Sequence, residues 1–279
     1  MKTPLATLST LAVAALALTG CGSSSSSSSS TSSSAASASS ASTSSVSAQA
    51  SSGKIEVFAA ASLNNAGADL EKTYEAANPG VDITFVYEGS AKLVTQIEQG
   101  ATPDMLITAD TKNMDKAKEL SEFSGSEPTV LATNKLVLVT ADGNPGKINS
   151  LEDLKNTDGV VAICKEDVPC GTLAHQELKK HDITLKNATT EGKVTDVATK
   201  VSTGNADAGF IYTTDLAAAQ KKGSNLGSVD LPDVERNEYP AALSKTGSNS
   251  EAAKKFNEWL KTSEDAKKIL TEYGFSTDK

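Results

Sequence analysis

The chain has 279 residues and a formal net charge of −9 at pH 7, with 22% charged and 4% aromatic residues. This length allows one large domain or two domains of ordinary size. The acidic balance excludes the basic surface that binds nucleic acid, and it leaves any anion site dependent on local groups rather than on long-range attraction.

The N-terminal segment predicts export and a lipid anchor. Lys2 and a short apolar run at residues 5–18 have the pattern of a secretory signal peptide, which we place at residues 1–20. The run is shorter than the ~20 strongly apolar residues of a membrane span. Its ending, Leu-Thr-Gly-Cys21, resembles a bacterial lipobox, in which the cysteine is lipidated and becomes the mature N-terminus. We therefore expect an extracytoplasmic protein anchored to the bacterial cell membrane through Cys21; an ordinary cleaved signal with an incidental cysteine is the alternative.

Residues 21–53 predict a flexible tether. They consist almost wholly of Ser, Thr and Ala, and Val46 is their only branched aliphatic residue. Such a segment cannot bury enough apolar surface to offset the entropy of ordering it. About 30 flexible residues reach on the order of 30 Å, so the tether would keep the folded part, from Lys54 onward, near the membrane. A mucin-like glycosylated stalk is the alternative.

The first half of the folded part alternates strands with helices. The predicted strands are residues 55–59, 81–87 and 104–108, and the predicted helices are residues 63–77, 91–99 and 111–120. This order is typical of a parallel α/β layer with right-handed crossovers. Residues 129–140 are rich in Val, Leu and Thr and predict one long strand that passes out of the first lobe.

A second α/β series follows. Its predicted strands are residues 159–164 and 206–212, and its predicted helices are residues 151–155, 172–180 and 194–202. Residues 238–244 predict a return strand, and helices at residues 250–261 and 264–273 would cover a sheet. Two lobes joined by two crossings are the simplest arrangement. Lobe I would comprise residues 54–132 and 233–279, and lobe II residues 133–232.

Two serines share one local pattern, because Ser62 and Ser90 each follow a predicted strand and stand where a helix starts. Capping of the helix is the ordinary structural role of such a serine. Ligands of open α/β sheets, however, bind at the carboxyl ends of the strands, where helix N-termini offer unpaired N–H groups to an anion. The pair therefore indicates a candidate anion site.

A third turn into a helix, Val168-Pro169-Cys170-Gly171, carries one of the two cysteines that follow Cys21. Cys164 lies six positions earlier, at the end of a predicted strand, and an exported protein meets an oxidising environment. The pair can close a disulfide, which in so small a ring contributes about 2 kcal/mol. Two separate buried thiols are the alternative.

Other chemistry has weaker support. Tyr212 ends an apolar strand, where it could be a core aromatic with its hydroxyl at the sheet edge. Cys170 and His175 would point to different faces of one helix, and no third group orients them, so we do not expect a thiol enzyme. No His/Cys cluster has the spacing of metal ligands, and we expect Asp104 and Asp110 to cap helices or to line a solvated face.

Taken in order, the motifs resemble a known family. They are Ala61-Ser62-Leu63, Gly89-Ser90-Ala91-Lys92-Leu93, residues 96–104 (QIEQGATPD), Val168-Pro169-Cys170-Gly171 and residues 204–212 (GNADAGFIY). Together they resemble the periplasmic molybdate-binding proteins, the solute receptors of molybdate ABC importers, over essentially all of residues 54–279.

The resemblance implies an α/β, two-lobed, periplasmic-binding-protein-like fold with mainly parallel sheets, flanking helices and a ligand cleft between the lobes. It implies that neutral donors hold a tetrahedral oxyanion, molybdate or tungstate: Ser62 and Ser90 through hydroxyl and N–H, Cys170 and Val194 through N–H, and Tyr212 through its hydroxyl. It implies no enzyme activity, no cofactor and no bound metal cation. The partner would be an ABC transporter permease, and the receptor a monomer.

The sequence departs from the family pattern at one position, and two alternative functions remain. The residue before Gly171 is often alanine in the family, and here it is Cys170, so we hypothesise that a Cys164–Cys170 disulfide clamps the ligand loop. A receptor of the same fold for another oxyanion, such as sulfate or phosphate, is the first alternative. A structural surface lipoprotein is the second. The sequence favours neither molybdate nor tungstate.

Overall fold

The computed structural model describes residues 53–231 and 233–277. The predicted signal peptide, the lipidation site at Cys21 and nearly all of the predicted tether lie outside these residues. Strand β1 (Gly53–Ala60) starts at the last residue assigned to the tether, because Gly53 already pairs with Val81 of the next strand. In the described part of the chain, no helix is long and apolar enough to cross a membrane.

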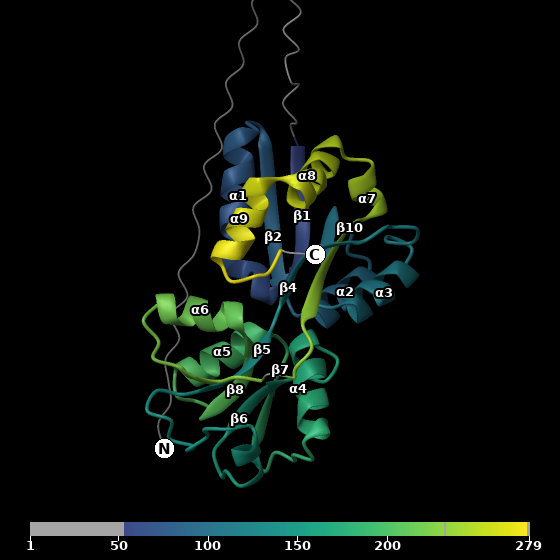
Figure 1. The fold of residues 1–279 in the computed structure, drawn as a ribbon. Coiled ribbons are helices and arrows are strands. Elements are labelled where there is room, and N and C mark those ends of the chain that lie inside the picture. Colours follow the sequence, from purple (N-terminus) through teal and green to yellow (C-terminus); the bar gives the residue numbers. More distant parts are fainter. Residues whose placement is uncertain (1–52, 232, 278–279) are drawn as a thin grey trace, which may run out of the picture. The chain divides into compact units, whose positions relative to one another are not determined.

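The first sheet has the strand order β2-β1-β3-β10-β4. These strands are β1, β2 (Val81–Glu88), β3 (Met105–Ile107), β4 (Thr129–Asn134) and β10 (Asn237–Leu243). Since alternate residues of a strand face opposite sides, Met105 and Ile107 join one hydrophobic core while Leu106 joins another. The first core includes α1 (Asn64–Ala77), α8 (Glu251–Thr262) and α9 (Glu264–Glu272), and the second includes α2 (Ser90–Glu98) and α3 (Thr111–Glu119) (Figure 1).

The second sheet has the strand order β7-β6-β8-β5-β9. These strands are β5 (Leu136–Thr140), β6 (Val161–Cys164), β7 (Ala188–Glu191), β8 (Ala208–Tyr212) and β9 (Gly227–Val229). Every residue of β5, β6 and β8 is buried, which explains why these segments are apolar at nearly every position. Helices α4 (Pro169–Lys180) and α5 (Val194–Ser202) both contact β6 and β8, and α6 (Thr213–Lys221) follows β8 directly.

The expectation of mainly parallel sheets was wrong. In the first sheet β1 pairs in parallel with β2 and β3, whereas β10 runs antiparallel to β3 and β4. In the second sheet β6 pairs in parallel with β7 and β8, whereas β5 runs antiparallel to β8 and β9. Each antiparallel pair includes β4, β5 or β10, the strands that carry the chain between the sheets.

The single long strand expected at residues 129–140 was also wrong. The segment forms two strands, β4 in the first sheet and β5 in the second, and the chain changes sheet at Lys135. The chain returns to the first sheet through β10, where Asn237 pairs with Asn134 of β4, so the two connecting segments lie side by side (Figure 1). This crossing places Asn134 within hydrogen-bond distance of Tyr239.

Smaller differences concern short elements. The chain forms β7, β9, α6 and α7 (Lys245–Ser248) where no element was predicted, and a short 3-10 turn at Ala61–Leu63. The helix predicted at residues 151–155 is a short 3-10 helix, Glu152–Lys155. Helix α4 begins at Pro169 rather than at residue 172, since proline is well suited to the first position of a helix. This earlier start puts Cys170 in the first turn of α4.

Candidate functional site

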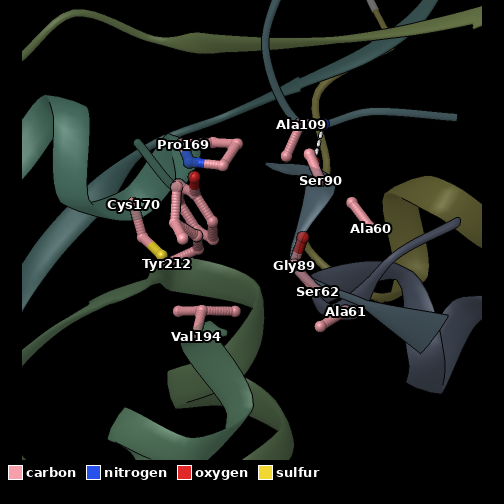
Figure 2. A pocket seen from close by; sticks show the side chains of 11 residues that line it. Ala60, Ala61, Ser62, Gly89, Ser90, Ala109, Pro169, Cys170, Val194 and Tyr212 are labelled. Atoms are coloured by element: carbon pink, nitrogen blue, oxygen red, sulfur yellow. Dashed lines mark hydrogen bonds between the residues drawn. The ribbon is translucent and has the colours of Figure 1, made fainter. Parts of the chain in front are cut away.

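A pocket of about 200 Å³ brings the sequence-predicted site residues together (Figure 2). Its lining residues are Ala60, Ala61, Ser62, Gly89, Ser90 and Ala109 from the first-sheet part, and Val168, Pro169, Cys170, Val194 and Tyr212 from the second-sheet part. The two groups face each other across the pocket in Figure 2. The described residues that line the pocket carry no charged side chain.

Both serines are buried, and the hydroxyl of neither caps a helix. Ser90 is the first residue of α2, whose N-cap is Gly89, and Ser62 lies inside the 3-10 turn that follows β1. Ser90 Oγ accepts a hydrogen bond from the N–H of Ala109 at 3.0 Å, and Ser62 Oγ lies 2.8 Å from Tyr239 Oη. These hydroxyls therefore do not have the helix-capping role that their positions in the sequence suggested.

Three helices begin at the pocket. The N-cap residues of α2, α4 and α5 are Gly89, Val168 and Lys193, and none of the three side chains caps its helix with a hydrogen bond. The first N–H groups of a helix have no carbonyl partner within the helix, and they carry the positive end of its dipole. The N–H groups of Ser90, Cys170 and Val194 lie in these first turns. Such groups are well suited to bind an anion.

Tyr212 supplies the remaining polar group from the end of β8. Its side chain is 1% exposed, and its hydroxyl has no hydrogen-bond partner among the described residues. Burial raises the pKa of this hydroxyl well above its ordinary value, with smaller contributions from Tyr239, Asp110 and Asp215. The hydroxyl therefore keeps its proton and is a free donor at the pocket.

Two carboxylates, Asp110 and Asp215, lie near the site without lining the pocket, and Asp104 lies at the other end of β3. Asp110 is the N-cap of α3, as expected, and accepts the N–H of Asn113 at 2.9 Å. Asp104 does not cap a helix, because it accepts the N–H of Glu56 in β1 at 2.8 Å. Asp215 was not predicted; it accepts the N–H of Tyr212 at 3.3 Å, and burial raises its pKa to about 7. No local sequence pattern marked Asp215, because its burial depends on tertiary packing.

The loops that precede Ser90 and Val194 touch each other. A Cβ atom added to Gly89 would lie 2.2 Å from the backbone oxygen of Gly192, so this approach requires glycine. Beside it, Lys193 Nζ lies 3.4 Å from Glu88 Oε2, and Lys92 Nζ lies 2.7 Å from Glu88 Oε1. These contacts hold the two sides of the pocket against each other.

A disulfide joins Cys164, at the end of β6, to Cys170, in the first turn of α4. Cys170 therefore has no free thiol, and His175 lies at a separate surface groove with Ile163 and Leu178. Gly171 allows α4 to approach the loop after β6, since a Cβ atom there would lie 1.8 Å from the oxygen of Lys165. Among the described residues, no group of three or more His, Cys, Asp or Glu side chains could hold a metal ion.

Comparisons with known proteins show the family and the fold of this chain. The family described as bacterial extracellular solute-binding protein matches residues 55–276. The molybdate-binding protein ModA of Mycobacterium tuberculosis is 38% identical over 222 residues, which are 80% of this chain and 84% of that protein. In fold, the periplasmic molybdate-binding protein of Azotobacter vinelandii matches with a TM-score of 0.70 at 21% identity, covering 81% of this chain and 100% of that chain. The sulfate-binding protein SubI of Mycobacterium tuberculosis matches with the same TM-score of 0.70 at 17% identity, covering 80% of this chain and 86% of that chain.

Proposed function

Because the chain belongs to the family of bacterial extracellular solute-binding proteins, we propose that it is the molybdate receptor of an ABC importer. It is a binding protein rather than an enzyme, and its place is outside the cytoplasm. Its ligand is the oxyanion itself, and the function requires no cofactor. The sequence identity to a molybdate-binding protein, 38% over 80% of the chain, supports this ligand.

One observation carries the proposal: a pocket without a charged side chain gathers hydroxyl and N–H donors from both sheets. We propose that Ser62, Ser90, Cys170, Val194 and Tyr212 bind the anion. Hydrogen bonds to a charged group contribute about 1.5–3 kcal/mol each, so five such donors can balance a buried dianion. Neutral donors also leave the anion free of a strong ion pair, which favours its release to a transporter.

The arrangement of donors favours an anion that has lost all its protons. The Ala109 N–H can only donate, so Ser90 Oγ accepts from it and keeps its own proton for a ligand. No carboxylate lines the pocket among the described residues, so an oxyanion that carries a proton of its own would find no charged acceptor and fits the site less well than a dianion. Molybdate and tungstate are dianions of nearly equal size, and we propose that both bind.

Capture would involve closure of two lobes. We propose lobe I at residues 54–132 and 233–279 and lobe II at residues 133–232, each contributing donors to the pocket. Closure by a hinge motion places the ligand between the lobes and presents surfaces of both to an ABC permease. Closure about the ligand requires no second chain, so we propose a monomer. Lipidation at Cys21 and the tether that follows would keep this receptor at the membrane.

A receptor for sulfate is the second candidate, because a sulfate-binding protein shares the fold with a TM-score of 0.70. Sulfate is smaller than molybdate, and its oxygens would lie too far from some of the donors of a pocket built for the larger anion. Ion size, rather than fold, separates the two candidates.

Calorimetric titration of the purified protein with molybdate, tungstate, sulfate and hydrogen phosphate tests the proposal. We expect tight one-to-one binding of molybdate and tungstate, and no comparable heat with the other two anions. Tight binding of sulfate without molybdate would establish the second candidate. Binding of none of the four would contradict the receptor function.

A further inference from the structure

A chain of buried hydrogen bonds starts behind Ser62 and leads away from the pocket. Tyr239 Oη lies 2.8 Å from Ser62 Oγ and 3.2 Å from Asn134 Nδ2. Tyr239 and Asn134 are at most 1% exposed, and neither lines the pocket. Ser62 follows β1, Asn134 ends β4 and Tyr239 lies in β10, so the chain joins three distant parts of the sequence.

The orientation of the Asn134 amide determines which atom donates in each of these hydrogen bonds. The N–H of Lys135 donates to Asn134 Oδ1 at 2.9 Å, so the amide oxygen of Asn134 faces Lys135 and its nitrogen faces Tyr239. An amide nitrogen donates only, and Tyr239 Oη therefore accepts from Asn134. The proton of Tyr239 is then left for Ser62 Oγ, and Ser62 keeps its own proton for an acceptor in the pocket.

The same amide also contacts the segment that carries Tyr212. Asn134 Nδ2 donates to Thr214 Oγ1 at 2.8 Å, and Thr213 Oγ1 donates to Asn134 Oδ1 at 2.9 Å. Thr213 and Thr214 are the first residues of α6, directly after Tyr212. The hydrogen bonds therefore connect Ser62, on one side of the pocket, to the chain segment of Tyr212 on the other side.

We propose that Tyr239 and Asn134 are positioning residues of the anion site, which hold the Ser62 hydroxyl as a donor; this inference rests on the proposed oxyanion-binding function. If Ser62 turned its proton toward Tyr239, the tyrosine proton would lose its acceptor inside the protein. An unpaired buried donor is costly, so Ser62 resists this rotation. Tyr239 and Asn134 thereby strengthen the preference of the site for dianions without contacting the bound anion.

A double-mutant cycle on the otherwise unchanged protein tests this inference. Molybdate affinity is measured for the wild type, Tyr239→Phe, Ser62→Ala and the double variant. We expect Tyr239→Phe to weaken binding by about 3- to 10-fold in the wild type, which corresponds to one ordinary hydrogen bond. In the Ser62→Ala background the same substitution should change affinity less than about twofold, because Tyr239 acts through Ser62. A merely structural role would instead give equal losses in both backgrounds.

Tyr87→Phe is the matched control, because Tyr87 Oη is also buried, has no hydrogen-bond partner among the described residues and lies outside the pocket. It should leave molybdate affinity unchanged. Asn134→Leu, measured in the same cycle, provides a second test should Tyr239→Phe fold poorly. Its effect should be smaller when Ser62 is alanine, and the part that remains reflects its hydrogen bonds to Thr213 and Thr214. If the substitutions change molybdate affinity equally in both backgrounds, or in neither, the inference is overturned. The proposed function still stands in that case, provided that the wild type binds molybdate. A wild type that binds no oxyanion would overturn both.

Discussion

The two sides of the pocket hold their donors in different ways. On the first-sheet side, the oxygen of each serine hydroxyl already has a protein partner, Tyr239 for Ser62 and Ala109 for Ser90. On the second-sheet side, the Tyr212 hydroxyl is buried without a partner among the described residues, and uncapped helix starts supply the other donors. The first side is therefore oriented before the ligand arrives, whereas the second side gains its hydrogen bonds only from the ligand.

The largest expected effect comes from separating the two sides. Gly89→Ala would place a methyl group 2.2 Å from the oxygen of Gly192, so the loops that carry Ser90 and Val194 cannot keep their contact. We expect molybdate affinity to fall by more than about 100-fold, since several charged hydrogen bonds depend on this approach. Isothermal titration calorimetry measures the loss.

Gly192→Ala is the matched control for this experiment. A Cβ atom at Gly192 would meet no atom within 4 Å, although the residue belongs to the same contact. Its affinity should stay within about twofold of the wild type. Equal losses for both variants would show that loop flexibility, and not the close approach at Gly89, governs binding.

Tyr212→Phe probes the second side alone. Removal of one hydroxyl that binds a charged ligand should weaken molybdate binding by about 10- to 150-fold. Because this hydroxyl has no partner among the described residues, the ligand-free protein should unfold at the same denaturant concentration or a slightly higher one. A variant that loses stability but keeps its affinity would remove Tyr212 from the site.

Ser90→Ala probes the first side, where affinity and stability should fall together. The substitution removes a ligand donor and also leaves the Ala109 N–H without its acceptor, at a cost of about 1–3 kcal/mol. Chemical denaturation of the ligand-free protein should therefore show a clear loss, in contrast to Tyr212→Phe. If both variants lose stability equally, the two sides do not differ as we describe.

The smallest effect concerns pH and the buried Asp215. Burial raises the pKa of Asp215 to about 7, so the folded protein binds a proton there that the unfolded chain releases near the ordinary pKa of 3.8. The folded state binds more protons in this window, and the free energy of unfolding should therefore fall as pH rises from about 4 to about 7. Asp215→Asn keeps an acceptor for the Tyr212 N–H and should abolish this contribution.

Denaturation curves of the wild type and Asp215→Asn, recorded at several pH values, give the difference that isolates Asp215 from other titrating groups. The free energy of unfolding of the wild type, minus that of Asp215→Asn, should decrease steadily as the pH rises from about 4 to about 7. A constant difference would contradict the raised pKa.

The sequence predicted the site more fully than its surroundings. Ser62, Ser90 and Cys170 stand in local strand–turn–helix motifs, whereas Val194 and the binding role of Tyr212 were predicted from the family resemblance; the structure places all five at one pocket. Their roles as ligand donors remain predictions. The two-lobed α/β class was likewise predictable, since the alternation of strands and helices can be recognised in short segments of the chain.

What the sequence could not predict depends on contacts between distant residues. Tyr239 lies 177 positions from Ser62 and 105 positions from Asn134 along the chain, and no local pattern predicts such pairing. The change of sheet at Lys135 lies inside a segment rich in Val, Leu and Thr, whose composition predicts one strand. Short edge strands such as β7 and β9 have too few residues to show a clear alternation.

The contact between Gly89 and Gly192 also bears on how fast the ligand dissociates. Ser90 and Tyr212 are each about 1% exposed, and the loops that touch at Gly89 and Gly192 lead directly into the first turns of α2 and α5, so we expect an anion held there to leave more easily once this contact opens. The rate at which the two loops separate should then contribute to the dissociation rate, in addition to the strength of the individual hydrogen bonds. A transporter that pulls these loops apart would shorten the residence time of the ligand without competing for a single donor.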